Sequence, residues 1–356
     1  MFKKSFLVLS VIVSSLSAFA AETAAPKVAA IKPPEKELVI YSARKEELIK
    51  PLLDQFTAKT GIPVKMLSDD APKLLARIES EGAQSPADVL ITVDVANLTI
   101  AKDKGLFAKL NSKTLNKNVP ALYRDKDGEW FGLSKRIRAV FYNKEKVKPE
   151  ELSTYEDLAN EKWKGSIVAR SSSHPYNQSL FAHLIKVHGE DKATAWAKGF
   201  VSNLARPPQG GDSDQLRAVA SGEAKLAISN SYYYGKMLTS ELPEDKLVAQ
   251  KVGIFFPNQK SAKGELNGVH VNISGGAVLK TSKNAKNAQK LLEFLSSSEA
   301  QDLYASLNKE FPVLATAKSD SVLASWGPFK EDKTLLGAWA PHSKQATLIS
   351  DKVGWK

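Results

Sequence analysis

The chain has 356 residues, 43% of them hydrophobic and 25% charged, with a formal net charge of +11. This composition excludes a largely disordered chain, and the length suits two domains of ordinary size better than one. There are no cysteines, so neither disulfides nor a lipid-modified N-terminal cysteine is possible, and stability must come from a large core.

The first 20 residues, MFKKSFLVLSVIVSSLSAFA, combine a basic start, an apolar stretch and small residues before Ala20. This pattern is typical of a secretory signal peptide, and the apolar stretch is shorter than the ~20 residues that span a bilayer. We therefore predict a signal peptide over 1–20, a flexible linker over 21–36 and a periplasmic protein. Export and the absence of a long basic run disfavour nucleic acid as a partner.

From residue 37 onward, apolar runs typical of buried strands alternate with helical patterns. The alternation predicts a parallel sheet with right-handed crossovers. Pro51 is awkward inside a helix, so the first helix is expected to begin near Lys50. Strands are predicted at 36–44, 63–68 and 87–94, and helices at 46–63, 72–82 and 96–105.

An extended segment over 130–147 precedes a second series, and the chain after residue 284 is predicted to be mainly helical. Predicted strands lie at 163–173, 224–231, 252–259 and 268–280, and helices at 177–189, 191–204 and 212–222.

Two of the extended segments, Ser134–Tyr142 and His270–Leu279, are long enough to cross between two α/β halves. The sequence thus predicts an α/β protein with two lobes joined by hinge strands. Residues 37–135 plus 276–356 form the N-terminal lobe with C-terminal helices, and 136–275 form the second α/β lobe. In such sheets a ligand binds in the cleft, at the carboxyl ends of the strands.

Three consecutive tyrosines, 232 to 234, directly follow the strand predicted at 224–231. Neither a strand nor a helix can point three neighbouring rings into one core. Loops at three predicted strand ends, 41–47, 169–179 and 229–236, are expected to meet in the cleft. They and the hinge segment carry the candidate site residues Tyr176, Tyr232, Tyr233, Arg44, Arg136 and Arg138.

Clustered phenols suit a hard trivalent cation, because such an ion can deprotonate a phenol and bind the phenolate oxygen. A softer metal would require Cys, Met or paired His, and this chain has three Met and five scattered His. The alternative is that the tyrosines line a cleft and stack on a sugar or another organic ligand.

Three segments, WKGSIVARSSSHPYNQSLFAHLI, AWAKGFVSNLARPPQGGDSDQLRAVASGEAKLAISNSYYYGKML and VGIFFPNQ…GVHVNISGGAVLK, resemble the periplasmic ferric-iron-binding proteins of bacterial ABC importers. The resemblance extends over 37–356 and implies a periplasmic-binding-protein fold that serves as a monomer for an inner-membrane ABC permease and its ATPase. By motif, it implies Tyr176, Tyr232 and Tyr233 as Fe(III) ligands. It also implies a carbonate or bicarbonate anion held by Arg44 and Arg136, with Arg138 as a weaker candidate.

Many relatives carry His or His-Tyr where this chain has Lys45-Glu46. We therefore expect three protein ligands, all from the second lobe, with an anion or water completing the coordination. Two other hypotheses stay open at this point. One is a binding protein for an oxyanion or small organic ligand with no metal. The other is an exported enzyme, but no nucleophile elbow or close carboxylate pair is present.

The neighbouring polar and aromatic residues are given structural roles. Tyr234 is expected in the wall or core, Asp94 at a helix N-cap, and His174 and His270 outside the ligand set.

Overall fold

The computed structural model describes residues 1, 37–260, 266–318 and 320–356. The predicted signal peptide and linker lie outside the described residues, apart from Met1. The described residues from Glu37 onward belong to one compact unit. In the part of the chain that the structure describes, no helix is both long and apolar enough to cross a membrane.

The first series of elements follows the predicted alternation of strands and helices. Helix α1 differs, because it starts at Glu46 and contains Pro51, at the cost of one helical hydrogen bond. It ends at Thr60, and the left-handed backbone of the following Gly61 (φ 72°) favours glycine. The elements are β1 (Leu38–Ser42), α1 (Glu46–Thr60), β2 (Val64–Ser68), α2 (Ala71–Glu81), η1 (Gly82–Gln84), β3 (Val89–Thr92), α3 (Val95–Asp103), α4 (Lys113–Asn118) and η2 (Ala121–Tyr123).

The second series is more helical than the first. Its elements are η3 (Pro149–Glu151), η4 (Glu156–Ala159), η5 (Glu161–Trp163), β5 (Ile167–Val168), α5 (Pro175–His188), α6 (Glu190–Ser202), α7 (Asp212–Ser221), β6 (Leu226–Asn230), α8 (Ser231–Met237), α9 (Pro243–Lys251) and β7 (Val252–Phe255).

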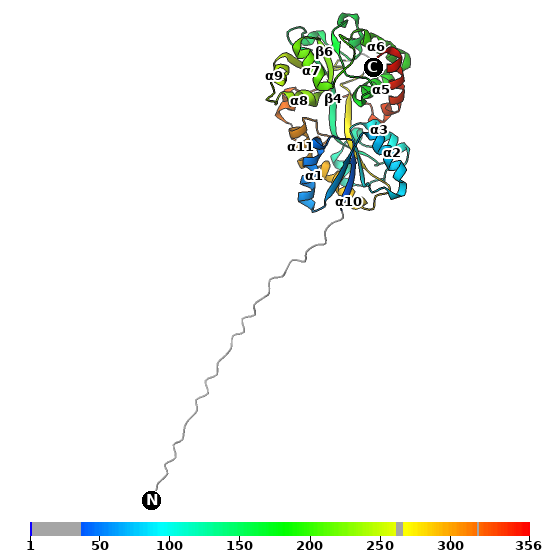
Figure 1. The fold of residues 1–356 in the computed structure, drawn as a ribbon, viewed down its shortest axis with the longest axis vertical. Coiled ribbons are helices and arrows are strands. Elements are labelled where there is room, and N and C mark those ends of the chain that lie inside the picture. Colours follow the sequence, from blue (N-terminus) through cyan, green and yellow to red (C-terminus); the bar gives the residue numbers. More distant parts are fainter. Residues whose placement is uncertain (2–36, 261–265, 319) are drawn as a thin grey trace. The chain divides into compact units, whose positions relative to one another are not determined.

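Two long strands, β4 (Phe131–Asn143) and β8 (Val271–Val278), connect the two series. The sheet order is β2-β1-β3-β8-β4-β6-β5, with β7 also paired to β4. The pairs β1–β2, β1–β3 and β5–β6 are parallel, while β3–β8, β8–β4 and β4–β6 are antiparallel. Both predicted crossing segments are therefore confirmed as strands that join two α/β lobes (Figure 1).

Strand β4 changes its partner at one point. Its residues up to Ile137 pair with β8, and its residues from Arg138 onward pair with β6. We call the lobe built on β1–β3 the first lobe and the lobe built on β5–β7 the second lobe. The backbone between Ile137 and Arg138 is thus where the sheet of the first lobe passes into that of the second.

The C-terminal elements are divided between the lobes. They are α10 (Ala285–Leu295), α11 (Ser298–Asn308), α12 (Ser321–Ser325), α13 (Leu336–Trp339), η6 (Ala340–His342) and α14 (Ser343–Val353). Helices α10 and α11 pack against α1, whereas α14 packs against α5 and α6, and α13 contacts both α3 and α5. The division into lobes stays a prediction, but these contacts favour assigning α14 to the second lobe instead of the first.

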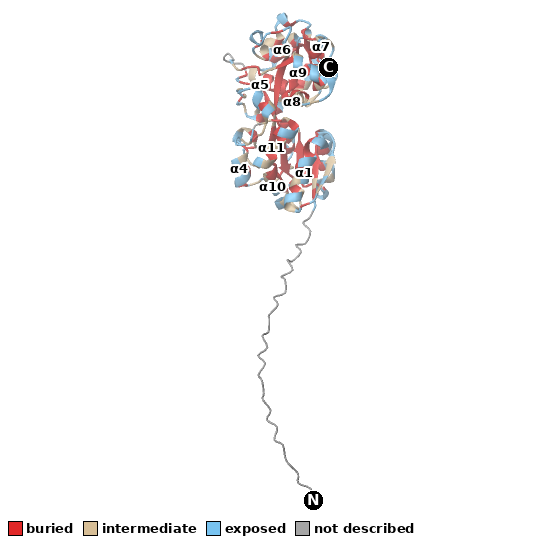
Figure 2. Cartoon of the chain, turned by 90° about the vertical axis from the view of Figure 1, so that its left-hand side faces the viewer, coloured by how far each residue is buried: buried red, intermediate tan, exposed pale blue. Residues whose placement is uncertain are grey.

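The core follows the strands through both lobes, and the exposed residues lie on the outer helix faces (Figure 2). The tryptophans of the second series, Trp163 and Trp196, are buried, as is Trp130 before β4. The predicted N-cap is confirmed, since the carboxylate of Asp94 accepts a hydrogen bond from the backbone N–H of Ala96 at 2.7 Å.

Candidate metal centre

The tyrosine run lies in a helix, not in the predicted loop. Strand β6 ends at Asn230, and α8 begins at the next residue. Neighbouring residues of a helix diverge by about 100°, so the three rings separate. Tyr234 turns into the core, where its hydroxyl donates to the carbonyl of Val252 at 2.7 Å and its ring packs 5.3 Å from that of Phe141. The core role predicted for Tyr234 is confirmed.

Tyr176 lies in the first turn of α5, directly after Pro175. The helix is capped by His174, whose Nδ1 accepts from the backbone N–H of Tyr176 at 3.3 Å. Burial and the charge of Arg170 lower the pKa of His174 to about 3, so the imidazole is neutral and free to accept. The structural role predicted for His174 is confirmed, and the cap fixes the backbone of Tyr176.

The structure brings the three candidate tyrosines together. The hydroxyls of Tyr176 and Tyr232 are 3.1 Å apart, and the rings of Tyr232 and Tyr233 stack with centroids 4.2 Å apart. Burial, followed by the charges of Tyr176 and Tyr233, raises the pKa of Tyr232 well above its ordinary value. Burial also raises the pKa of Tyr233. Without a cation these phenols are therefore protonated at neutral pH.

Three guanidinium groups surround the ring of Tyr176. Arg136, Arg170 and Arg138 lie 5.3, 5.5 and 5.9 Å from its centroid. Arg170 was not among the predicted site residues, although it lies in the predicted loop 169–179 directly after β5. The position of an arginine at a strand end was the signal that could have identified it.

Arg138 is held by polar partners inside the second lobe. Its guanidinium pairs with the carboxylate of Asp212 at 2.6 Å and donates to the side-chain oxygens of Asn177 at 2.6 Å and Asn230 at 3.2 Å. Both ionic partners are buried. Arg138 thus ties β4 to α5, α7 and β6, and this pairing disfavours the anion-binding role predicted for it.

Arg44 and Arg136 meet at one hydroxyl. Both guanidinium groups donate to Ser274 Oγ, at 2.6 and 3.0 Å. Arg44 also pairs with the buried Glu310 at 2.8 Å, which offsets its charge. Arg136 donates its other hydrogen bonds to the carbonyls of Val93 and Ile273, so it brings a positive charge without a paired carboxylate among the described residues.

Lys45 and Glu46 are both exposed at the start of α1. Around the tyrosines, the charge balance is positive, because Arg136 and Arg170 add to the Arg138–Asp212 pair. Asp212 is shared, since Arg170 lies 3.5 Å from its other oxygen. The cluster therefore offers phenolic oxygen ligands in a field that favours anions.

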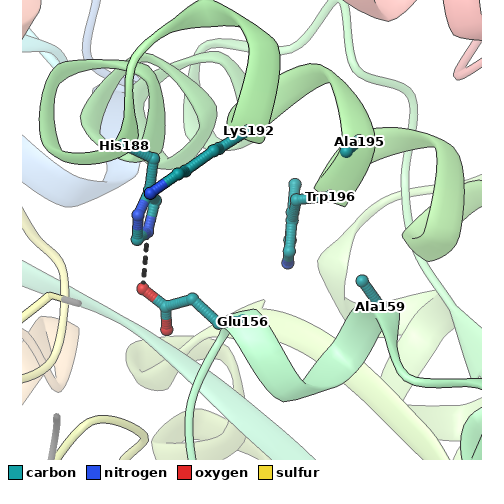
Figure 3. Close-up of a pocket in the computed structure, with 6 residues that line it drawn as sticks. All are labelled: Glu156, Ala159, His188, Lys192, Ala195 and Trp196. Atoms are coloured by element: carbon teal, nitrogen blue, oxygen red, sulfur yellow. Dashed lines mark hydrogen bonds and ion pairs between the residues drawn. The ribbon is translucent and has the colours of Figure 1, made fainter. Parts of the chain in front are cut away.

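Within the described residues, no group of three or more His, Asp or Glu side chains is placed to hold a metal. A hollow of about 310 Å³ lies between η4 and α6 and contains none of the predicted site residues. Figure 3 shows His188 and Glu156 at one side of it, joined by a 2.8 Å contact, with Trp196 standing opposite.

Comparisons with known proteins agree with this architecture. The family model of bacterial extracellular solute-binding proteins matches residues 52–331. "Iron uptake protein A1" of Synechocystis is 50% identical over 322 residues, which are 90% of this chain and 88% of that protein.

Two solved structures cover 90% of this chain and 100% of their own, each with a TM-score of 0.84. One is Trichodesmium IdiA (FutA) in complex with iron and citrate, at 48% identity, and the other is a ferric binding protein from Campylobacter jejuni, at 42%.

Proposed function

Because the chain belongs to the bacterial extracellular solute-binding proteins, we propose that it captures Fe(III) in the periplasm and delivers it to an ABC importer without catalysis of its own. The observation that carries this proposal is the meeting of Tyr176, Tyr232 and Tyr233, with two hydroxyls 3.1 Å apart and two rings stacked. The relatives named for iron uptake and ferric binding support it.

The charges favour a ferric ion. Three phenolates carry three negative charges and neutralise Fe³⁺, and phenolate is a hard oxygen donor suited to a hard cation. Burial raises the pKa of Tyr232 and Tyr233, so these phenols keep their protons until a cation displaces them, and binding releases protons. All three proposed ligands come from the second lobe, so iron can bind there before the lobes close on it.

A small anion completes the coordination in this proposal. Arg136 is the best anchor, because it lies against Tyr176 and has no paired carboxylate among the described residues. Arg44 shares Ser274 with it but is paired with Glu310, so we expect it to contribute less. Carbonate fits such a site, and citrate is a second candidate, because the iron-bound Trichodesmium relative was solved with it.

The test is a ferric titration of the iron-free protein, followed by metal analysis and the visible phenolate-to-iron charge-transfer band. Wild type should become coloured with one iron per chain, and Tyr176→Phe and Tyr233→Phe should lose both signals. Tyr142→Phe, a half-buried tyrosine of β4, is a matched control that should keep them. A wild-type protein that stays colourless and iron-free would instead support a metal-free binding protein for an oxyanion or organic ligand.

A further inference from the structure

A buried row of polar groups connects the hinge to Tyr176. Tyr176, Ser179 and His183 follow one another at spacings of three and four on α5, so they share one face of the helix. Ser179 Oγ donates to the carbonyl of Tyr176 at 3.0 Å and lies 3.2 Å from His270 Nε2. His270 Nδ1 lies 2.9 Å from His183 Nδ1.

The far end of this row of polar groups is a carboxylate from the C-terminal segment of the protein. His183 Nε2 lies 3.3 Å from Asp332 Oδ1. Burial favours the neutral acid, but hydrogen bonds from His183 and Thr334 outweigh it and lower the pKa of Asp332. The ring of Trp339 stacks on that of His183, with centroids 6.0 Å apart. His183, His270 and Trp339 are almost fully buried.

The hydrogen bonds along this row of polar groups have one consistent direction from donor to acceptor. Ser179 has a single hydroxyl proton, which it gives to the Tyr176 carbonyl, so its oxygen must accept from His270 Nε2–H. The second nitrogen of His270 then accepts from His183 Nδ1–H, because burial and His183 lower the pKa of His270 and leave it neutral. The donors from His183 Nδ1 through His270 Nε2 to Ser179 Oγ therefore all point toward Tyr176.

His270 lies at the point where β4 changes its partner. Its carbonyl accepts from the backbone N–H of Arg138 at 3.1 Å, and its own N–H donates to the hydroxyl of Tyr155 at 3.0 Å. The hydroxyl of Tyr155 in turn donates to the carbonyl of Arg138. A bend of the two hinge strands at this point would move His270 relative to α5.

We propose that His270, acting through Ser179, is a positioning residue that holds Tyr176 in its ligating geometry and makes that geometry depend on the hinge. The proposal rests on the proposed function of Tyr176 as an iron ligand. Opening of the lobes would lengthen the contact between His270 and Ser179, loosen the first turn of α5 and favour iron release.

The test compares Ser179→Ala with Ser221→Ala in the full-length protein. Ser221 Oγ makes the same bond to the carbonyl three residues earlier, Ala218, also at 3.0 Å, but its hydroxyl contacts no histidine. Ser179→Ala should lower the melting temperature of the iron-free protein more than Ser221→Ala, because Ser179 is buried and its loss also leaves His270 Nε2–H unpaired, whereas Ser221 is exposed. Only Ser179→Ala should speed the removal of iron by a competing chelator, by about fivefold, the factor equivalent to ~1 kcal/mol, and shift the charge-transfer band.

Two further variants separate positioning from folding. His270→Gln keeps an N–H donor for Ser179 and should release iron more slowly than His270→Leu. The double variant Ser179→Ala with His270→Leu should release iron no faster than the faster of the two single variants. The reason is that both substitutions interrupt the same row of polar groups. Equal release rates for Ser179→Ala and wild type would overturn the positioning role. If Tyr176→Phe binds iron normally, the ligand assignment itself is wrong.

Discussion

Two tyrosines of α8, Tyr232 and Tyr234, should give opposite phenotypes when each loses only its hydroxyl. Tyr234→Phe removes a buried hydrogen bond to the carbonyl of Val252 at 2.7 Å, which should cost about 1 kcal/mol of the free energy of unfolding, or up to about 3 if the carbonyl stays unpaired. For a chain of this size, 1 kcal/mol corresponds to a fall in melting temperature of about 2 °C. Iron binding should not change.

Tyr232→Phe should do the reverse. It removes one hydrogen bond between two phenols, at 3.1 Å, which lowers stability, and it also removes the cost of burying a polar oxygen. The two effects oppose each other, so the free energy of unfolding of the iron-free protein should change by less than about 1 kcal/mol. Iron affinity should fall by more than the 10- to 100-fold typical of losing an outer-shell partner.

Urea unfolding of the iron-free variants and a ferric titration followed at the charge-transfer band measure the two effects separately. If Tyr234→Phe abolished iron binding at unchanged stability, the assignment of ligand and core roles along α8 would be refuted.

Three further predictions concern protons, the anion and the buried ion pair. Because the raised pKa values of Tyr232 and Tyr233 keep these two phenols protonated, iron must displace their protons, and these two ligands predict an affinity that rises up to about a hundredfold per pH unit near neutrality. Competition against a chelator of known protonation measures this rise, and a pH-independent affinity would contradict it. Arg136→Ala should weaken iron binding about tenfold or more with bicarbonate or citrate present and little without them, and equal titrations would show that Arg136 holds no anion. Asp212→Asn should cost about 3 kcal/mol of unfolding free energy, because it leaves Arg138 buried without its carboxylate, whereas Asp54→Asn, in an exposed pair, should change urea unfolding by less than about 0.5 kcal/mol.

The strands and most helices could be predicted because their apolar periodicity is local. Helix α8 could not, because Ser-Tyr-Tyr-Tyr-Gly has poor helix propensity. Its conformation is set by tertiary packing, with Tyr234 anchored on Phe141 and Val252. The same limit applies to Pro51, which the packing of α1 tolerates against its local preference.

In the candidate site, the sequence predicted residues better than it predicted their partners. The tyrosine cluster followed from residue type, position at strand ends and family resemblance. The pairing of Arg138 with Asp212 and of Arg44 with Glu310 joins residues far apart in the chain, and no local pattern encodes such a pair. A buried arginine in a hinge strand therefore could not be assigned to an anion or to a carboxylate before the fold was known.

The pairing of β3 with β8 bears on the order in which the chain folds. Val89 pairs with Val278, whereas β5, β6 and β7 of the second lobe come from one continuous stretch of the chain. Pairings between distant residues form slowly, because a long loop must close first. During synthesis the sheet of the second lobe can assemble as soon as its own strands exist, but the sheet of the first lobe lacks a member until β8 has been made. The sheet that begins first is thus completed last.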